Sequence, residues 1–210
     1  MVPQLDLRFL TGSLVQLEPL SMRRAPDLAS AADEDRSTYG FTSVPRRDQV
    51  EDYIADLLTR SEQEEFRPFA QVRLADDRAI GCTSFGHLRS WPGMSRLSAV
   101  EIGWTWLSAS AQGTGINKEA KLLLLTQAFE GWGADRVDIK TDARNERSRG
   151  AIEGIGATFE GILRNWSPSH APGEEGQLRD SAMFSIVAGE WPSAKSELLR
   201  RIHQIRKADP

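Results

Sequence analysis

The residues best suited to chemistry lie in the stretch AQGTGINKEAK, 111–121, where two glycines stand one residue apart between an apolar strand-like run and a long apolar segment. A glycine-rich turn that opens a helix directs bare backbone N–H groups and the positive end of the helix dipole at one point. No side chain obstructs the backbone at Gly113 and Gly115. The stretch therefore predicts a phosphate site, the alternative being a turn that only joins a strand to a helix.

Two familiar phosphate motifs do not fit this stretch. A Walker loop needs a Ser or Thr after its lysine, whereas Lys118 precedes Glu119. A dinucleotide fingerprint needs a third glycine where Lys118 stands and an acidic residue at the end of the next strand, whereas Asp135 comes before its strand. The pattern that remains is Gln/Arg-x-x-Gly-x-Gly/Ala, met by Gln112 and Gly115, with Asn117 in place of the final small residue.

Composition narrows the classes of protein and site. With 210 residues and 40% hydrophobic content, the chain can bury one core, most simply in a single domain. Cys82 is the only cysteine, which excludes an intrachain disulfide and favours a small buried hydrophobe. The histidines, His87, His170 and His203, are scattered without ligand spacing, so we expect no metal. A formal net charge of −4 argues against a general nucleic-acid binder.

Two further features concern location. No apolar run approaches the length of about twenty residues that spans a membrane. The first ten residues carry Asp6 and Arg8 where a signal peptide would be apolar. We therefore expect a cytoplasmic protein without a membrane partner.

Hydrophobic periodicity indicates the elements that must position the glycine turn. Period-two alternation predicts strands, and apolar residues three and four apart predict helices. In chain order the expected elements are a strand at 14–20, a helix that Ser21 caps and that runs to Ala31, a helix at 48–60, a hairpin from Ala70, Val72 and Leu74 to a second arm at 80–87, a strand at 99–107, a helix at 117–132, a strand at 136–140, a helix at 145–155, strands at 157–164 and 180–189, and a C-terminal amphipathic helix. This order predicts a mixed α/β (α+β) domain with one central twisted sheet flanked by helices. The glycine turn then lies at the carboxyl end of a strand, where open sheets bind ligands.

Three separated segments carry a resemblance to a known family. EIGWTWL precedes the glycine turn, a leucine-rich helix follows it, and a later block is formed by Asn145, Ser148, Ile152, Gly156, Ala157, Glu160 and Gly161. With these segments, and from LVQLEPL to AMFSIVAGEW, the chain resembles the GCN5-related N-acetyltransferases (GNAT), in the branch of the ribosomal-protein alanine acetyltransferases. The resemblance implies a single GNAT-like domain, expected over residues 1–190. We expect residues 191–210 to form a basic amphipathic helix docked on that domain or on a second subunit.

The same resemblance implies acetyl-CoA as the cosubstrate, whose pyrophosphate the N–H groups of residues 113–118 would surround. It also implies that the strand following Glu101 opens a gap in the sheet. Backbone N–H groups near Trp106 and Leu107 would hold the thioester carbonyl and the pantetheine arm there. The residues expected to bind the coenzyme are Trp106, Leu107, Gln112, Gly113, Thr114, Gly115, Ile116, Asn117, Lys118, Asn145 and Ser148.

Acetyl transfer to an amine requires a neutral nucleophile, a stabilised oxyanion and a proton for the departing thiolate. An α-amine with a pKa of about 8 needs little help from a base, whereas a lysine amine with a pKa of about 10.4 needs much more. Glu101 is the expected base, acting through a water, with a structural ion pair or an orienting role as alternatives. The resemblance implies that Ser148 protonates the thiolate and that Asn145 binds the pantetheine arm. Both residues could instead serve their helix alone, Asn145 as the N-cap and Ser148 at the third helical position.

Aromatic residues are expected mostly in the core and in the walls of the site, and the resemblance implies that some of them line the acceptor side. Those expected there are Tyr39, Phe41, Phe85, Trp104 and Trp166. The acceptor is either a small amine, such as an amino acid conjugate or an antibiotic, or the N-terminal amine of a protein, and the sequence does not rank the two. The leading function is direct acetyl transfer in a ternary complex, and the alternative is a non-catalytic acyl-CoA sensor or interaction module. A homodimer is compatible with the C-terminal helix.

Overall fold

The computed structural model describes residues 8–63, 66–94 and 96–208. Within these ranges eight strands form one sheet in the order β1-β2-β3-β4-β5-β6-β8-β7. Neighbouring strands are antiparallel except β5 and β6, which are parallel. Asp6 and residues 209–210, which entered the expectations above, lie outside the described residues.

The strands follow the hydrophobic alternation. In the C-terminal hairpin the first strand is longer than expected, and the second strand begins and ends two residues earlier than expected. The strands are β1 (Leu10–Thr11), β2 (Val15–Pro19), β3 (Phe66–Arg73), β4 (Arg78–Arg89), β5 (Ala99–Leu107), β6 (Arg136–Asp142), β7 (Thr158–Pro168) and β8 (Leu178–Val187). Val15 and Leu17 share one buried face of β2, as predicted. Leu74 differs from the expectation, since it lies in the turn after β3 and is 42% exposed.

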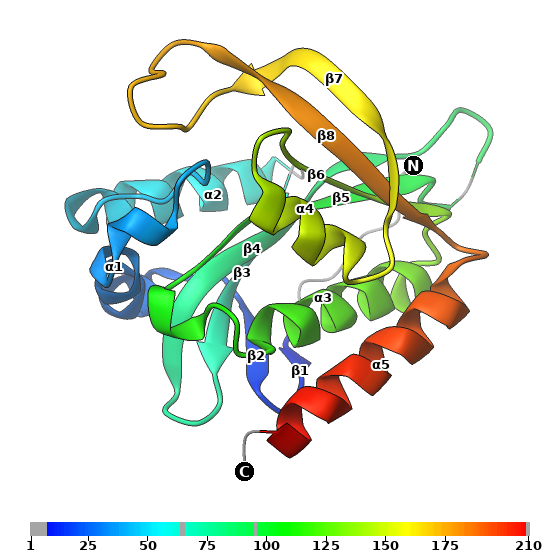
Figure 1. The fold of residues 1–210 in the computed structure, drawn as a ribbon, viewed down its shortest axis with the longest axis horizontal. Helices are drawn as coiled ribbons and strands as arrows, with labels where there is room; N and C mark the ends of the chain where they lie inside the picture. Colours follow the sequence, from blue (N-terminus) through cyan, green and yellow to red (C-terminus); the bar gives the residue numbers. More distant parts are fainter. Residues whose placement is uncertain (1–7, 64–65, 95, 209–210) are drawn as a thin grey trace.

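The helices cover both faces of the sheet. They are α1 (Ala25–Asp33), α2 (Val50–Glu62), α3 (Ile116–Thr126), α4 (Glu146–Glu153) and α5 (Trp191–Ala208), with short 3-10 turns at Met22–Arg24, Arg36–Thr38, Arg47–Gln49 and Ala109–Ala111. Figure 1 shows α1 and α2 on one side of the sheet and α3 and α5 on the other, with the β7–β8 hairpin arching above α4.

Two of the expected helices begin or end differently. Ser21 makes no capping hydrogen bond with its side chain, because a 3-10 turn precedes α1. The helix expected at 117–132 is α-helical only to Thr126 and then widens into a π-helical turn, Gln127–Gly131. The backbone N–H of Trp132 closes that wider turn on the carbonyl of Gln127 at 2.9 Å.

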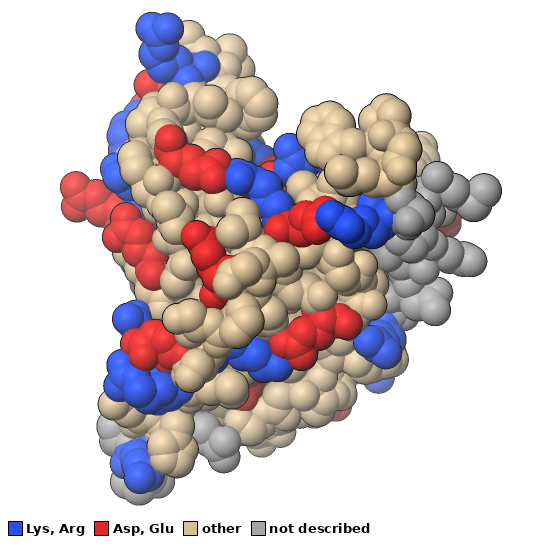
Figure 2. Space-filling view, turned by 90° about the vertical axis from the view of Figure 1, so that its right-hand side faces the viewer, with Lys and Arg blue, Asp and Glu red and all other residues tan. Residues whose placement is uncertain are grey.

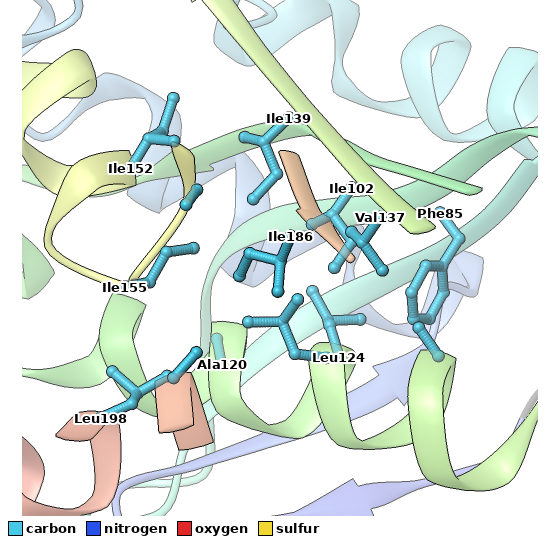
Figure 3. Close-up of a cluster of buried hydrophobic side chains, with 14 of the residues drawn as sticks. Phe85, Ile102, Ala120, Leu124, Val137, Ile139, Ile152, Ile155, Ile186 and Leu198 are labelled. Atoms are coloured by element: carbon cyan, nitrogen blue, oxygen red, sulfur yellow. The ribbon is translucent and has the colours of Figure 1, made fainter. Parts of the chain in front are cut away.

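Two apolar clusters hold the layers together. One lies between the sheet and helices α3, α4 and α5, and Figure 3 shows Ile102, Leu124 and Ile186 pointing into it. The other lies beneath α1 and α2 and contains Leu28 and Ile54. Because β3 and β4 contribute to both clusters, these strands are buried on both faces.

The C-terminal helix packs on its own chain. Its apolar stripe, Trp191, Ala194, Leu198 and Ile202, is buried in the cluster shared with α3. The burial of this stripe stabilises the docked helix, because an isolated amphipathic helix gains little in water.

Candidate active site

A gap opens in the sheet where β5 and β6 part. Their parallel pairing covers only Ala99, Val100 and Glu101 against Arg136, Val137 and Asp138. Beyond that point β5 bulges away from its regular register with β4, and Trp104 in the bulge has the unusual φ of 51°. Residues 102–107 and 139–142 thus face a gap in the described sheet, with Glu101 at its closed end, as the resemblance implied.

The glycine turn lies at the open end of this gap, directly after β5. Gly115 is the N-cap of α3 with φ 86°, and Gly113 has φ 79°. Both values lie in the left-handed region that favours glycine. A Cβ atom on Gly113 would meet nothing within 4 Å, whereas one on Gly115 would lie 3.2 Å from Cγ2 of Ile205 and 3.6 Å from Cδ1 of Leu14. The turn is therefore open at Gly113 and supported from behind at Gly115.

Glu119 fixes the first turn of α3 to the N-terminal hairpin. Its carboxylate accepts the backbone N–H groups of Ser13, Leu14 and Val15 at 2.9, 2.6 and 2.9 Å, and the Ser13 hydroxyl at 2.6 Å. Hydrogen bonds to a charged acceptor are among the stronger ones in proteins. The helix end that would face a phosphate is consequently held in place.

Gln112 connects the turn to the two other segments around the mouth of the gap. Its Nε2 donates to the Leu107 carbonyl at 3.0 Å and to the Thr38 hydroxyl at 3.1 Å. Its Oε1 accepts from Arg147 of α4 at 2.8 Å, and the same guanidinium donates to the Thr38 carbonyl at 2.5 Å. The start of α4 thus lies across the mouth of the gap from the glycine turn.

Three of the expected coenzyme residues can contribute only backbone groups. The side chains of Trp106, Leu107 and Ile116 are buried in the two apolar clusters. The indole of Trp106 also donates to the Tyr53 hydroxyl at 3.3 Å. This agrees with the expectation that backbone N–H groups near Trp106 and Leu107 meet the ligand.

The polar side chains of the turn differ in whether they have hydrogen-bond partners. The Thr114 hydroxyl donates to the Ala111 carbonyl at 2.8 Å, and Lys118 is half-buried. Oδ1 of Asn117 is buried and has no hydrogen-bond partner in the described part of the chain. Since buried polar atoms in native proteins are rarely unpaired, this acceptor fits a ligand that supplies a donor, and the pantetheine arm carries amide donors.

Asn145 and Ser148 begin α4, and the structure separates their helical roles. Oδ1 of Asn145 accepts the backbone N–H of Ser148 at 3.0 Å, which makes Asn145 the N-cap. The Ser148 hydroxyl itself makes no hydrogen bond with the described residues. The helix therefore uses the backbone of Ser148 and leaves its hydroxyl available for chemistry.

Glu101 forms a charged cluster with residues from β4 and β6. Its side chain is 8% exposed; Oε1 pairs with Nζ of Lys140, and Oε2 lies 2.9 Å from Nδ1 of His87. Burial alone would raise the pKa of Glu101, but the hydrogen bond from His87 and the charge of Lys140 outweigh burial and lower the pKa below its ordinary value. Glu101 is therefore ionised at neutral pH and is a weak proton acceptor.

A buried amine lies on the opposite face of β5. Nζ of Lys121 donates to the Thr105 hydroxyl at 2.7 Å and lies 3.4 Å from the Thr83 hydroxyl. Burial lowers the pKa of Lys121 to about 7. This group lies outside the Glu101 cluster, and the sequence analysis did not single it out.

Two of the five aromatic residues predicted to line the acceptor side lie in the core, Phe85 most clearly. Phe85 is fully buried on the α3 side of β4, with its ring centroid 4.5 Å from that of Trp132 and 6.1 Å from that of Phe69. Figure 3 shows it in the core. Tyr39 is buried too, and its hydroxyl donates to the Ala31 carbonyl at 2.9 Å. Burial raises the pKa of Tyr39 to about 12, so neither side chain offers a polar group to a substrate.

The other three aromatic residues remain candidates for the acceptor side. Trp104 lies beside the Glu101 cluster, with its ring centroid 5.3 Å from His87 and 5.4 Å from Nζ of Lys140. Phe41 is half-buried under the guanidinium of Arg144 at 4.9 Å. Trp166 is 54% exposed on the edge strand β7, and the structure shows no ring stacking for it among the described residues.

Sequence reasoning missed the charged partners of Glu101. Asp138, Lys140 and Asp142 alternate along β6 and so share one face. Three charged residues on one face of a central strand are a signal for a polar site, which the search for known motifs overlooked. Each is paired in the structure: Asp138 with Arg89 and Arg136, Lys140 with Glu101, and Asp142 with Arg144.

The described ranges contain neither a metal-binding cluster nor a helix that could span a membrane. No group of three or more His, Cys, Asp or Glu side chains there is placed to hold a metal ion. None of the helices described is both long and apolar enough to cross a membrane. On the face shown in Figure 2, acidic and basic side chains are interspersed and form no continuous field of one sign.

Comparisons with known proteins agree with this geometry. Residues 15–158 match the model of the family described as "Acetyltransferase (GNAT) domain". Two relatives come from Bacillus subtilis: "Putative ribosomal N-acetyltransferase YdaF", 34% identical over 45% of this chain and 49% of its own length, and "Probable N-acetyltransferase YjcK", 29% identical over 74% and 86%. The chain thus spans about half the length of the first. A GCN5-related N-acetyltransferase from Brucella melitensis has a similar structure, with a TM-score of 0.80 and 25% identity over 95% of this chain and 87% of that chain.

Proposed function

Because this chain belongs to the GNAT family, and is therefore an acetyl-CoA-dependent N-acetyltransferase, we propose that it acetylates a primary amine in a direct ternary complex. The acceptor is a small molecule or a protein N-terminus. The observation that carries the proposal is the gap between β5 and β6, which has the glycine turn at its mouth and the ionised Glu101 at its closed end.

The open backbone at Gly113 and the helix N-terminus at Gly115 fit a pyrophosphate. Gln112 and Arg147 border the same mouth, and the unpartnered Oδ1 of Asn117 fits a ligand with hydrogen-bond donors. The bound coenzyme supplies the activated acetyl thioester. The chain supplies a rigid slot that orients this thioester toward Glu101.

Glu101 and Ser148 take complementary roles in this proposal. The acceptor nitrogen attacks the thioester carbonyl, so that a C–N bond forms and the C–S bond breaks. The proton lost by nitrogen passes through water to Glu101 or to solvent, and the Ser148 hydroxyl donates a proton to the departing thiolate and is reprotonated by solvent. Because the lowered pKa makes Glu101 a weak base, the site favours an amine that is already neutral, such as an α-amine with a pKa of about 8.

A covalent route through the only cysteine is disfavoured. Cys82 is buried in the cluster beneath α1 and α2, and burial raises the pKa of its thiol to about 12. A thiol in that state does not form the thiolate that acts as a nucleophile. The acetyl group is therefore proposed to pass directly from coenzyme to amine.

Thiol release from acetyl-CoA, measured against a panel of small amines and N-terminal peptides, tests the proposal. We expect release with at least one acceptor and intersecting initial-velocity lines when both substrates are varied. Parallel lines would contradict the ternary complex, and tight coenzyme binding without release for any acceptor would contradict an acetyltransferase. The proposed setting is the cytoplasm, and a homodimer stays a prediction that sedimentation velocity would check.

A further inference from the structure

Arg179 lies on the sheet face that carries the Glu101 cluster. It is two residues before Ser181, which pairs with Asp142 of β6, so Arg179 and Asp142 project from the same face. Opposite Arg179 on β7 is Ser167, whose hydroxyl accepts from Nε of Arg179 at 3.0 Å. This bond orients the guanidinium on the face where the proposed function places the acceptor.

The rest of this guanidinium is unpartnered. Arg179 is half-buried, yet within the described part of the chain its two terminal nitrogens donate no hydrogen bond and no carboxylate comes within salt-bridge distance. A half-buried charge without a counter-ion is costly to keep. The planar guanidinium of Arg presents parallel N–H donors that suit a carboxylate, and here most of these donors have no partner among the described residues.

The two acidic groups whose charges act on Arg179, Asp142 and Glu101, are already paired with other cations. Asp142 receives Nε and one terminal nitrogen of Arg144 at 3.0 and 2.9 Å, and Glu101 is held by Lys140 and His87. Burial lowers the pKa of Arg179 below its ordinary value, and the charges of Asp142 and Glu101, which raise the pKa, do not outweigh burial. Because these carboxylates are paired with other cations, they do not neutralise the charge of Arg179.

We propose that Arg179 binds a carboxylate of the acceptor, so that the acceptors of this enzyme are amines that carry a carboxylate near the reacting nitrogen. The inference rests on the proposed function and narrows its substrate class. Such a carboxylate has two sources: the α-carboxylate of an amino acid or its conjugate, or an acidic side chain next to a protein N-terminus. In either case Arg179 holds the carboxylate while Glu101 faces the amine.

Matched acceptor pairs test the proposal and separate the two sources. One pair is alanine and alaninamide; the other is the peptide amides Ala-Asp-Ala and Ala-Asn-Ala. Each pair keeps the amine and removes one negative charge. For each pair, kcat/KM for the acid is divided by kcat/KM for the amide, and this ratio is compared between the wild-type protein and Arg179→Gln. The comparison removes the intrinsic reactivity of each amine, because that reactivity is the same for both proteins.

We expect Arg179→Gln to lower this ratio by about 10- to 100-fold for one of the pairs, as for the loss of a charge-assisted bidentate contact. Acetyl-CoA affinity should not change. Arg179→Lys, which keeps the charge but not the planar guanidinium, should lose less and guards against misfolding of the first variant. Ser167→Ala frees Nε and should lower the ratio by about 2- to 10-fold. Arg200→Gln, which removes an exposed charge on α5, is the matched control and should leave the ratio unchanged.

Other outcomes overturn the inference and identify the step that failed. Equal acid-to-amide ratios in the wild-type protein and Arg179→Gln, with acetylation intact, would remove Arg179 from acceptor recognition and leave the proposed function standing. Acetylation confined to panel acceptors without a carboxylate would do the same. Absence of thiol release with every acceptor would overturn the proposed function, and the substrate class with it.

Discussion

The two ends of the gap are built in different ways. The mouth is a turn of backbone N–H groups with few charges, fixed by Glu119 on one side and by Ile205 on the other. The closed end is a set of charged side chains from β4, β5 and β6, in which Glu101 depends on both Lys140 and His87. A site made of backbone N–H groups is little affected by side-chain substitutions unless a glycine that lines it gains a Cβ atom. In a cluster of ion pairs, by contrast, replacing one residue leaves its charged partner unpaired.

This difference predicts how substitutions at the two ends combine. Effects at the mouth and at Glu101 should be nearly additive, because the two share no partner among the described residues. Effects within the closed end should be strongly non-additive.

The largest effect is expected at the closed end. Glu101→Gln should lower kcat/KM by about 10² to 10⁴-fold at unchanged acetyl-CoA affinity, because the amide can neither hold the amine electrostatically nor accept its proton. It should also destabilise the protein, because it leaves Lys140 nearly buried without its partner. Steady-state kinetics and chemical denaturation measure the two effects.

The pH dependence and a double variant separate these roles of Glu101. A lowered folded-state pKa means that the ion pair stabilises the protein above the ordinary glutamate pKa, and that this stability is lost as pH falls toward the folded value. Glu101→Gln should remove that acid-side dependence. Combining it with Lys140→Met should restore stability but not turnover, and recovery of both would make Glu101 purely structural.

The next effect is expected at the mouth. Gly115→Val should weaken coenzyme A binding by about 100-fold, since it disturbs several backbone N–H contacts to a charged group. The valine must also adopt φ 86° and approach Ile205. Gly133→Val is the matched control, because Gly133 has φ 65° and open space around it at the far end of α3. Calorimetry should find lower stability in both variants but lost affinity only in Gly115→Val.

A smaller effect is expected for Ser148→Ala, at the start of α4. Because Asn145 caps the helix through the backbone of Ser148, stability should stay the same. Loss of the proton donor should lower kcat and kcat/KM together by about 10-fold. The loss should shrink with acyl donors whose thiols are more acidic. A thermal shift with normal turnover would return Ser148 to a structural role.

The smallest effect on catalysis is expected for Lys121, on the face of β5 opposite Glu101. Because its folded-state pKa of about 7 lies below the unfolded value, the unfolded chain binds a proton that the folded protein does not between these two pH values. Stability should therefore rise with pH from about 7 to about 10 in the wild-type protein. Lys121→Met should flatten that rise and increase stability at pH 7, without altering kcat. Denaturation midpoints across this range provide the check.

Backbone features of the site were predictable because they depend on local sequence. The two glycines at 113 and 115 predict an unobstructed turn, and Asn145 is a favoured N-cap residue. The alternation in β5 and β6 likewise predicts strands. These inferences need only propensity and short spacing.

The side-chain clusters were not predictable, because they depend on register between distant strands. Lys140 meets Glu101 only through the pairing of β5 with β6, and Ser167 meets Arg179 only after a bulge in β7 shifts the hairpin. Phe85 was misassigned because both faces of β4 are buried, so hydrophobicity does not tell which face borders the site. The π-helical turn at the end of α3 has no signal in residue propensity.

The position of Gly115 between Leu14 and Ile205 also bears on how the protein folds. These neighbours come from nearly opposite ends of the described chain, so the support behind the turn consists of contacts of very high sequence separation. Such contacts form late, because the entropy of closing the intervening loops must be offset first. During synthesis, the mouth of the gap gains its full support only after α5 has left the ribosome, and the nascent enzyme should therefore acquire coenzyme affinity only once α5 has docked.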